Sequence, residues 1–82
     1  MSDRAKRYLL RLGALVGGQT NGGVLGYLGV GEQAGLTTDE TLTAVLELAA
    51  DCYVTYGVYS EAIWLTDTGT WWCRRNGGVE PP

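Results

Sequence analysis

The side chains that most often perform catalysis are few in this sequence and lack partners at a useful spacing. There is no histidine, so Ser2 and Ser60 have no imidazole to serve as a general base, and Cys52 and Cys73 have none to activate their thiols. Two cysteines without histidine also form no metal-binding spacing. We therefore predict a protein that is not an enzyme and that holds no metal and no cofactor.

Residues 29–34, Gly-Val-Gly-Glu-Gln-Ala, match the letters of the dinucleotide-binding pattern G-x-G-x-x-A. That pattern needs a preceding strand and a surrounding βαβ unit, and a chain of 82 residues is too short for the usual fold. We interpret Gly35 instead as a turn between two helices, with Leu36 as its buried plug.

Charged residues are segregated along the chain, and the net charge is −3. Lys and Arg occur only near the two ends: Arg4, Lys6, Arg7, Arg11, Arg74 and Arg75. The acids fill the middle, and a net negative charge disfavours bulk attraction to nucleic acid or anionic lipid. The spacing of Arg4, Arg7 and Arg11 places them on one helix face. A solvated face is our first interpretation of this ridge, and a contact surface for a phosphate backbone or an acidic partner is the alternative.

The stretch from Thr37 to Tyr53 is predicted to form the central helix. Thr37 followed by Glu40 is a capping box, in which each side chain binds a backbone N–H of the first turn. Ala44, Leu48 and a series of residues at helical spacing are expected to form the buried side: Leu42, Val45, Leu46, Ala49 and either Cys52 or Tyr53. The polar side has no Lys or Arg, and we predict that it binds a partner protein through four carboxylates: Asp39, Glu40, Glu47 and Asp51.

A first helix is expected from Ser2, its cap, to about Val16. The uncharged residues 12–31 are long enough to span a membrane, but polar residues 19–21 lie at their centre among many glycines, which a bilayer penalises. We therefore expect no membrane contact and a cytoplasmic location. Cys52 and Cys73 are then expected to be reduced, although a disulfide between them remains open.

After Tyr53 the sequence turns to β-forming residues, and a C-terminal β-hairpin is predicted. Residues 61–66 and 70–75 flank a three-residue loop, Asp67-Thr68-Gly69. This register makes Trp64 and Trp72 a cross-strand pair on one face and puts Trp71 on the other. The three tryptophans are candidate aromatic anchors for a partner, and packing over the helices is the alternative.

The predicted order of elements resembles that of a winged helix-turn-helix domain. Residues 31–37 are similar to the turn between the second and third helices of that family, and Ala34 to its small turn residue. Residues 65–69, Leu-Thr-Asp-Thr-Gly, are similar to the L-T-x-x-G at the end of the wing. In many of those regulators this motif opens a further helix, which would put Trp71 and Trp72 on a helix. We favour the hairpin, because tryptophan and cysteine have low helix propensities.

The expected fold is thus mainly α with a C-terminal β-hairpin (α+β): winged-helix-like, with three helices and a two- to three-stranded antiparallel sheet. Residues 1–76 are expected to form a single domain and residues 77–82 a flexible tail. The resemblance implies that the central helix is a recognition helix whose first residues contact bases. That helix offers carboxylates where DNA binding needs cations.

The leading functional hypothesis is a small acidic module that binds a protein partner and regulates or inhibits it, with nucleic-acid-handling proteins among the conceivable partners. Compact acidic phage inhibitors of bacterial defence complexes are similar in size and charge. A first alternative is a DNA-binding transcription regulator, possible as a homodimer, that uses five arginines: Arg4, Arg7, Arg11, Arg74 and Arg75. A second alternative is a homo-oligomeric assembly subunit.

Overall fold

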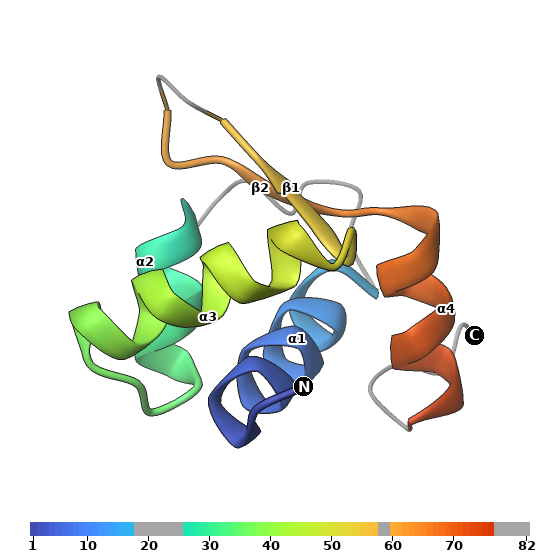
Figure 1. Ribbon diagram of the computed structural model, residues 1–82, viewed down its shortest axis with the longest axis horizontal. Coiled ribbons are helices and arrows are strands. Elements are labelled where there is room, and N and C mark those ends of the chain that lie inside the picture. Colours follow the sequence, from blue (N-terminus) through green and yellow to red (C-terminus); the bar gives the residue numbers. More distant parts are fainter. Residues whose placement is uncertain (18–25, 58–59, 77–82) are drawn as a thin grey trace.

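The computed structural model describes residues 1–17, 26–57 and 60–76. Within these ranges the chain forms four helices and one pair of antiparallel strands (Figure 1): α1 (Asp3–Gly17), α2 (Gly26–Gln33), α3 (Thr38–Ala50), β1 (Val54–Tyr56), β2 (Ile63–Leu65) and α4 (Asp67–Arg75). The prediction of a mainly α fold with a small antiparallel sheet is confirmed, whereas the prediction of three helices is wrong. The predicted tail, residues 77–82, lies outside the described residues. None of the described helices combines the length and the apolar character that a membrane crossing requires.

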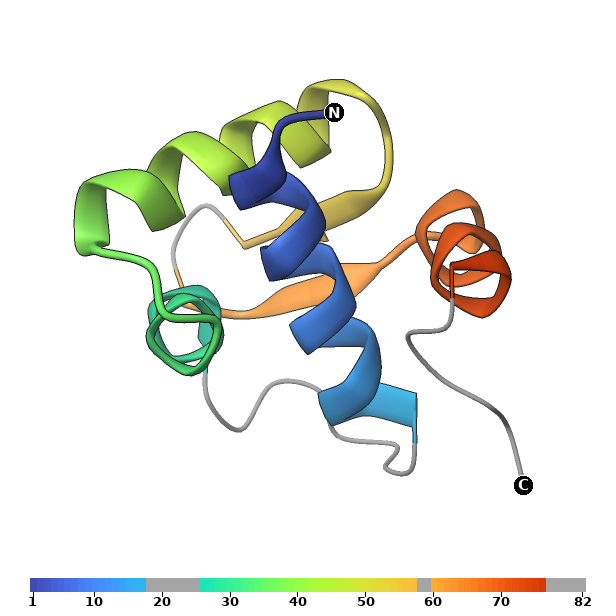
Figure 2. The ribbon, with the colours of Figure 1, turned by 90° about the horizontal axis from the view of Figure 1, so that it is seen from below.

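The first helix supplies the centre of the core. Its predicted cap is confirmed, because the Ser2 hydroxyl accepts a hydrogen bond from the Ala5 N–H at 3.2 Å. From below, α1 crosses the molecule in front of α3 and the strands (Figure 2). Tyr8 on its inner side is fully buried, and its hydroxyl donates to the Tyr27 carbonyl at 2.8 Å. Burial keeps the pKa of this hydroxyl above its ordinary value, so it remains a donor and links α1 to α2.

The turn between α2 and α3 has the conformation that the sequence predicts. Gly35 has φ +79°, in the left-handed region that glycine adopts without strain, and Leu36 is buried behind it. The capping box is also confirmed. The Thr37 hydroxyl accepts from the Glu40 N–H at 3.2 Å, and the Glu40 carboxylate accepts from the Thr37 N–H at 3.0 Å.

The helices α2 and α3 approach each other most closely at Gly31 and Thr41. A Cβ atom added to Gly31 would overlap the Thr41 side chain. Thr41 is therefore buried although its side chain is polar. The absence of a side chain at Gly31 lets α2 lie directly on α3.

The buried side of α3 differs from the predicted one. Leu42 and Leu46, expected in the core, are 40% and 59% exposed. The inner side consists of four residues: Thr41, Ala44, Val45 and Leu48. The helix is rotated relative to the expectation because Thr41 must face Gly31, and this rotation carries Leu46 outward.

The predicted hairpin of residues 61–66 and 70–75 is wrong. β2 pairs instead with β1, in the register Val54 to Leu65 and Tyr56 to Ile63. The reason lies in the Thr66 hydroxyl, which accepts from the Gly69 N–H at 3.0 Å and so caps α4. The motif at residues 65–69 thus opens a helix, which is the arrangement that the family resemblance offered as the alternative.

The last helix packs on α1 through Cys73. The thiol is buried and donates to the Leu9 carbonyl at 3.4 Å. The predicted pairing of Trp64 with Trp72 does not form, because Trp72 belongs to α4. Trp72 packs edge-on against Tyr53, with 6.4 Å between ring centroids. Both described cysteines are free thiols, Cys52 being exposed.

Candidate functional site

An open pocket of about 240 Å³ lies where α2, α3 and β1 meet. We call it the α3 groove. It is lined by Tyr27, Leu42, Val45, Leu46, Tyr56 and Gly57. The two exposed leucines are four residues apart on α3, so they stand one helical turn apart along its edge. A single exposed leucine is ordinary, but two that stand together beside a pocket form an exposed apolar patch.

Hydrogen bonds to the interior fix the walls of the α3 groove. The Tyr27 N–H donates to the Glu61 carbonyl at 2.7 Å, and the Tyr27 carbonyl accepts from the buried Tyr8 hydroxyl. The N–H of Gly57, which also lines the groove, donates to the Ala62 carbonyl at 3.0 Å. The groove is therefore formed by backbone that is already ordered, so a ligand need not organise it.

Two of the four predicted carboxylates are engaged within the chain. Glu40, besides closing the capping box, forms an ion pair with Arg4, with 3.4 Å between Oε2 and Nε. Glu47 accepts from the Ser2 N–H at 2.8 Å and from the Ser2 hydroxyl at 2.9 Å. Hydrogen bonds from Thr37 lower the pKa of Glu40, with a smaller contribution from Arg4, and hydrogen bonds from Ser2 lower the pKa of Glu47. Both carboxylates connect α3 to the start of α1.

The other two predicted carboxylates are exposed and lie on different sides of α3. Asp39 precedes Leu42 by three residues and Leu46 by seven, so it shares their side of the helix. Asp51 follows Glu47 by four residues and shares its side instead. The structure thus does not bring the four carboxylates together as one free surface. Of the four, only Asp39 shares the side of α3 that carries Leu42 and Leu46.

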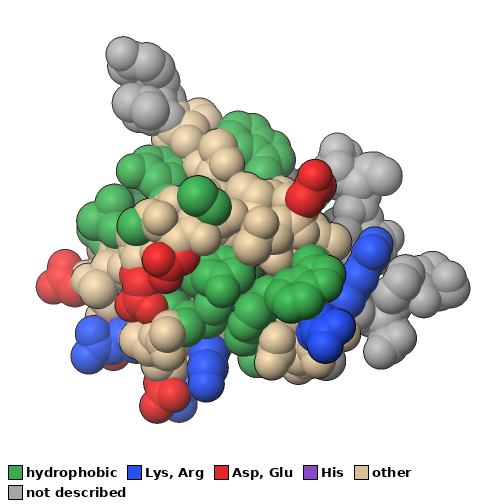
Figure 3. All heavy atoms as spheres, turned by 45° about the vertical axis from the view of Figure 1, so that its right-hand side comes forward, with side chains coloured by type: hydrophobic (Ala, Val, Ile, Leu, Met, Phe, Trp, Pro, Cys, Tyr) green, Lys and Arg blue, Asp and Glu red, His purple; other side chains and the backbone are tan. Residues whose placement is uncertain are grey.

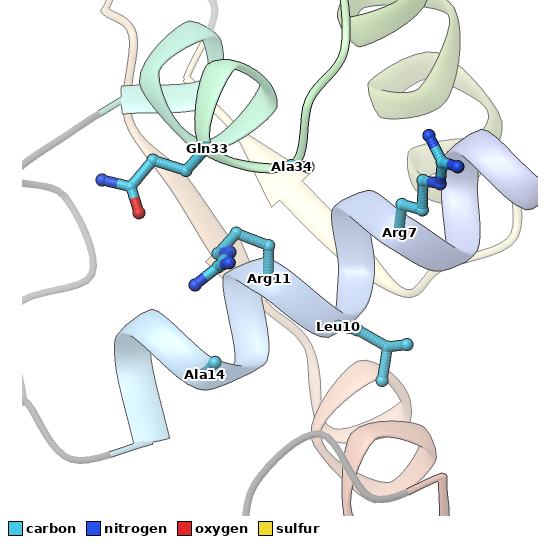
Figure 4. Close-up of a pocket in the computed structure, with 6 residues that line it drawn as sticks. All are labelled: Arg7, Leu10, Arg11, Ala14, Gln33 and Ala34. Atoms are coloured by element: carbon cyan, nitrogen blue, oxygen red, sulfur yellow. The ribbon is translucent and has the colours of Figure 1, made fainter.

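A second open pocket, of about 440 Å³, lies between α1 and the end of α2 (Figure 4). Its lining residues are Arg7, Leu10, Arg11, Ala14, Gln33 and Ala34. The side chains of Arg11 and Gln33 extend toward each other across the gap, whereas Leu10 points away from α2. The cations on this side of the molecule therefore belong to α1, and none belongs to α3.

The remaining predicted site residues lie on β2 and α4. Trp64 is 49% and Trp71 is 57% exposed, while Trp72 is half-buried against Tyr53. The Arg75 guanidinium stacks over the Trp71 ring at 4.9 Å from its centroid. Arg74 is exposed beside it. Figure 3 shows basic side chains at the lower left and at the right of one face, with hydrophobic side chains between them.

Sequence reasoning did not single out Tyr27 and Tyr56, which line the α3 groove, or Glu61, whose carbonyl binds the Tyr27 N–H. Tyr27 lies in a glycine-rich stretch without clear periodicity, and Tyr56 and Glu61 meet it only through the pairing of β1 with β2. In the part of the chain that the structure describes, no cluster of His, Cys, Asp or Glu is placed to hold a metal ion. Comparison with protein-family models, with curated proteins and with solved structures gave no significant match to this chain.

Proposed function

We propose that the chain is a protein-binding module on a winged-helix-like scaffold, and that the α3 groove is its docking site. The observation that carries this proposal is the exposure of Leu42 and Leu46 beside an open apolar pocket. Covering each leucine with a partner would contribute roughly 1.5 to 3 kcal/mol, scaled by the part now exposed. Exposed, grouped apolar side chains beside an ordered pocket are typical of sites that anchor another protein.

The winged-helix part of the proposal is supported by the order of elements. α2, the turn at Gly35 and α3 follow one another as in a helix-turn-helix, the β1–β2 pair corresponds to the wing, and Thr66 begins α4 within the L-T-x-x-G motif. In such a scaffold α3 and the wing form the usual contact surface. The α3 groove lies between these two elements.

A protein is favoured over DNA as the occupant because this surface has no cations. From Leu12 to Cys73 the sequence contains neither Lys nor Arg. Affinity for DNA depends largely on Lys and Arg that neutralise phosphates. A recognition helix with two exposed leucines and Asp39 lacks the groups that hold a duplex.

One observation favours DNA binding as a second candidate function. Arg7 and Arg11 line the α1–α2 pocket together with Gln33, and Arg74 and Arg75 are exposed on α4. A duplex would then meet α1 and α4 rather than α3. This candidate requires binding to random duplex DNA that falls steeply with salt and is lost in the double variant Arg7→Ala, Arg11→Ala.

The test of protein binding uses a partner captured from the native host by a photo-crosslinker at position 46, which is then purified. Leu42→Ala and Leu46→Ala should each weaken its binding by about tenfold, or about 1.4 kcal/mol, which is more than most interface residues cost when truncated. Trp71→Ala is the matched control, because Trp71 is as exposed as Leu46 but lies on α4. The proposal is wrong if the groove variants bind the partner as well as the wild type does, or if only Trp71→Ala loses affinity.

A further inference from the structure

We infer that the α3 groove accepts a cationic segment of a partner protein, with apolar side chains at its centre and Lys or Arg at both ends. This inference rests on the proposed function and adds the chemistry of the occupant. It follows from two exposed carboxylates on the elements around the groove, Asp39 and Glu61, and from the absence of Lys and Arg on α2, α3 and β1, which line it.

Asp39 supplies the negative charge on the α3 side. It lies two helical turns before Leu46 on the same side of the helix, and it is exposed. The cap of α3 is formed by Thr37 and Glu40, so the Asp39 carboxylate is not needed there. Among the described residues it makes no ion pair. Its charge is therefore available to a ligand that covers the leucines.

Glu61 supplies the negative charge on the α2 side. Its carbonyl accepts from the Tyr27 N–H, and its carboxylate lies beside Gly26: a Cβ added to Gly26 would be 3.3 Å from Glu61 Oε2. Tyr27 lines the groove, and the neighbouring Ala62 carbonyl binds the N–H of Gly57, which also lines it. Glu61 is exposed. Backbone hydrogen bonding thus holds residue 61 against Tyr27 of the groove, with its carboxylate beside Gly26.

The elements that line the groove carry acids but no Lys or Arg, and this also favours a cationic occupant. Between Leu12 and Cys73 there is no Lys or Arg, and all acids of the chain except Asp3 and Glu80 fall in this range. A surface of one sign attracts ligands of the opposite sign and repels those of its own. An acidic segment is therefore disfavoured.

A second copy of the chain is disfavoured as occupant for the same reason. A symmetric dimer formed groove to groove would bring the same patch of both copies together. Asp39 and Glu61 of one copy would then face carboxylates of the other, and neither set has cations to offset it. A partner with cations at the ends of its apolar segment meets the groove without this cost.

The dimensions of the groove limit the apolar part of the occupant. A pocket of about 240 Å³ beside two leucines one turn apart has room for one or two large side chains. An amphipathic helix presents such a pair at i and i+3 or i+4. We therefore expect a short segment with two apolar anchors and flanking cations.

The test is selection from a displayed library of random peptides of about twelve residues, a length that forms about three helical turns. The wild-type chain is the bait, and peptides that also bind the Leu46→Asp variant are removed. We expect the recovered peptides to carry paired apolar residues and a net positive charge. Their affinity should fall about two- to fivefold in Asp39→Asn and again in Glu61→Gln, the range of exposed ion pairs.

Asp51→Asn is the matched control, because it removes the same charge from α3 on the other side of the helix. It should leave peptide affinity unchanged, since Asp51 is exposed at the end of α3 away from the leucines. Raising the salt from about 0.05 M to about 0.5 M should weaken binding to the wild type and weaken it less in the Asp39→Asn, Glu61→Gln double variant.

The possible results separate this inference from the proposed function. Peptides that need Leu42 and Leu46 but are neutral or acidic overturn the inference and leave the docking site in place. Equal losses of affinity in Asp39→Asn and Asp51→Asn also overturn the inference and leave the docking site in place. Failure to recover any peptide that depends on the two leucines overturns the proposed function. A dimer in light scattering that dissociates in Leu46→Asp makes a second copy the occupant and overturns the inference.

Discussion

The two sides of α3 are built from different residues and serve different purposes. The inner side, centred on Leu48 and Ala44, is fully buried against α1 and the strands. The outer side carries Leu42 and Leu46, which remain exposed at the edge of an open pocket. The inner side stabilises the fold by packing in the core. The outer side is apolar although it does not belong to the core.

This difference shows that side-chain hydrophobicity alone does not identify the core of this protein. Thr41, a polar residue, is buried because Gly31 leaves space for it, while two leucines on the same helix are exposed. The side of a helix that is buried depends on how closely its neighbours approach. The apolar residues left outside are then available for a partner.

The strongest test of the comparison replaces one leucine on each side of α3. Leu48→Ala should lower the free energy of unfolding by about 2 to 5 kcal/mol, because a buried leucine leaves a cavity. Leu46→Ala should change it by less than about 0.5 kcal/mol, as surface substitutions usually do. Urea unfolding followed by circular dichroism measures both values. Equal losses would show that the two sides do not differ.

A second test concerns the contact that rotates α3. Gly31→Ala should destabilise the chain by about 1 to 3 kcal/mol, because the added methyl group meets Thr41 and the helices must separate. The double variant Gly31→Ala, Thr41→Ala removes two of the three overlapping atoms but keeps the Cβ of residue 41, so it should recover only part of the loss. Gly29→Ala, on the same helix, controls for the helix propensity gained when alanine replaces glycine. A Gly31→Ala variant as stable as the wild type would contradict the proposed cause of the rotation.

A third test addresses the start of α3, on which both sides depend. Thr37→Ala removes one partner of the capping box and should cost about 0.5 to 2 kcal/mol of stability. Thr38→Ala is the control, because Thr38 is exposed and makes no capping bond. Because the α3 groove lies further along the helix, partner affinity at a temperature where both variants are folded should be unchanged. A loss of affinity in Thr37→Ala alone would show that the groove needs the cap.

The smallest expected effect is a loss of stability at acidic pH. The folded chain has lowered pKa values for Glu40 and Glu47, against an ordinary value of 4.5. The two carboxylates contribute fully to the free energy of unfolding above their ordinary pKa. This contribution is lost as the pH falls through the lower pKa values of the folded state. Urea midpoints should therefore fall as the pH drops below about 5, and fall less in the double variant Glu40→Gln, Glu47→Gln. An unchanged acid dependence in the double variant would contradict the intramolecular role of these carboxylates.

The features that the sequence predicted correctly are those set by neighbouring residues. The Ser2 cap, the capping box at Thr37 and the glycine turn at Gly35 each involve groups within a few positions of one another. The physical chemistry of such short contacts depends little on the rest of the fold. The start of α3 and the position of Leu36 followed from it.

The features that the sequence predicted wrongly depend on distant residues. The strand partner of residues 63–65 is residues 54–56 rather than residues 70–75, and the choice rests on the Thr66 hydroxyl, which also donates to the Cys52 carbonyl. Asp67-Thr68-Gly69 fits a turn and a helix start equally well. The candidate site depends on the same kind of information, because Tyr27, Tyr56 and the leucines meet only after the strands have paired.

The reactivity of the buried Cys73 thiol reports how often α4 separates from α1. Burial raises the pKa of this thiol to about 11, so in the closed state almost none of it is the reactive thiolate. Each time α4 separates from α1, the thiol regains an ordinary acidity and becomes accessible to reagent. The rate of labelling at Cys73, with exposed Cys52 as an internal standard, therefore measures how often the last helix leaves the core.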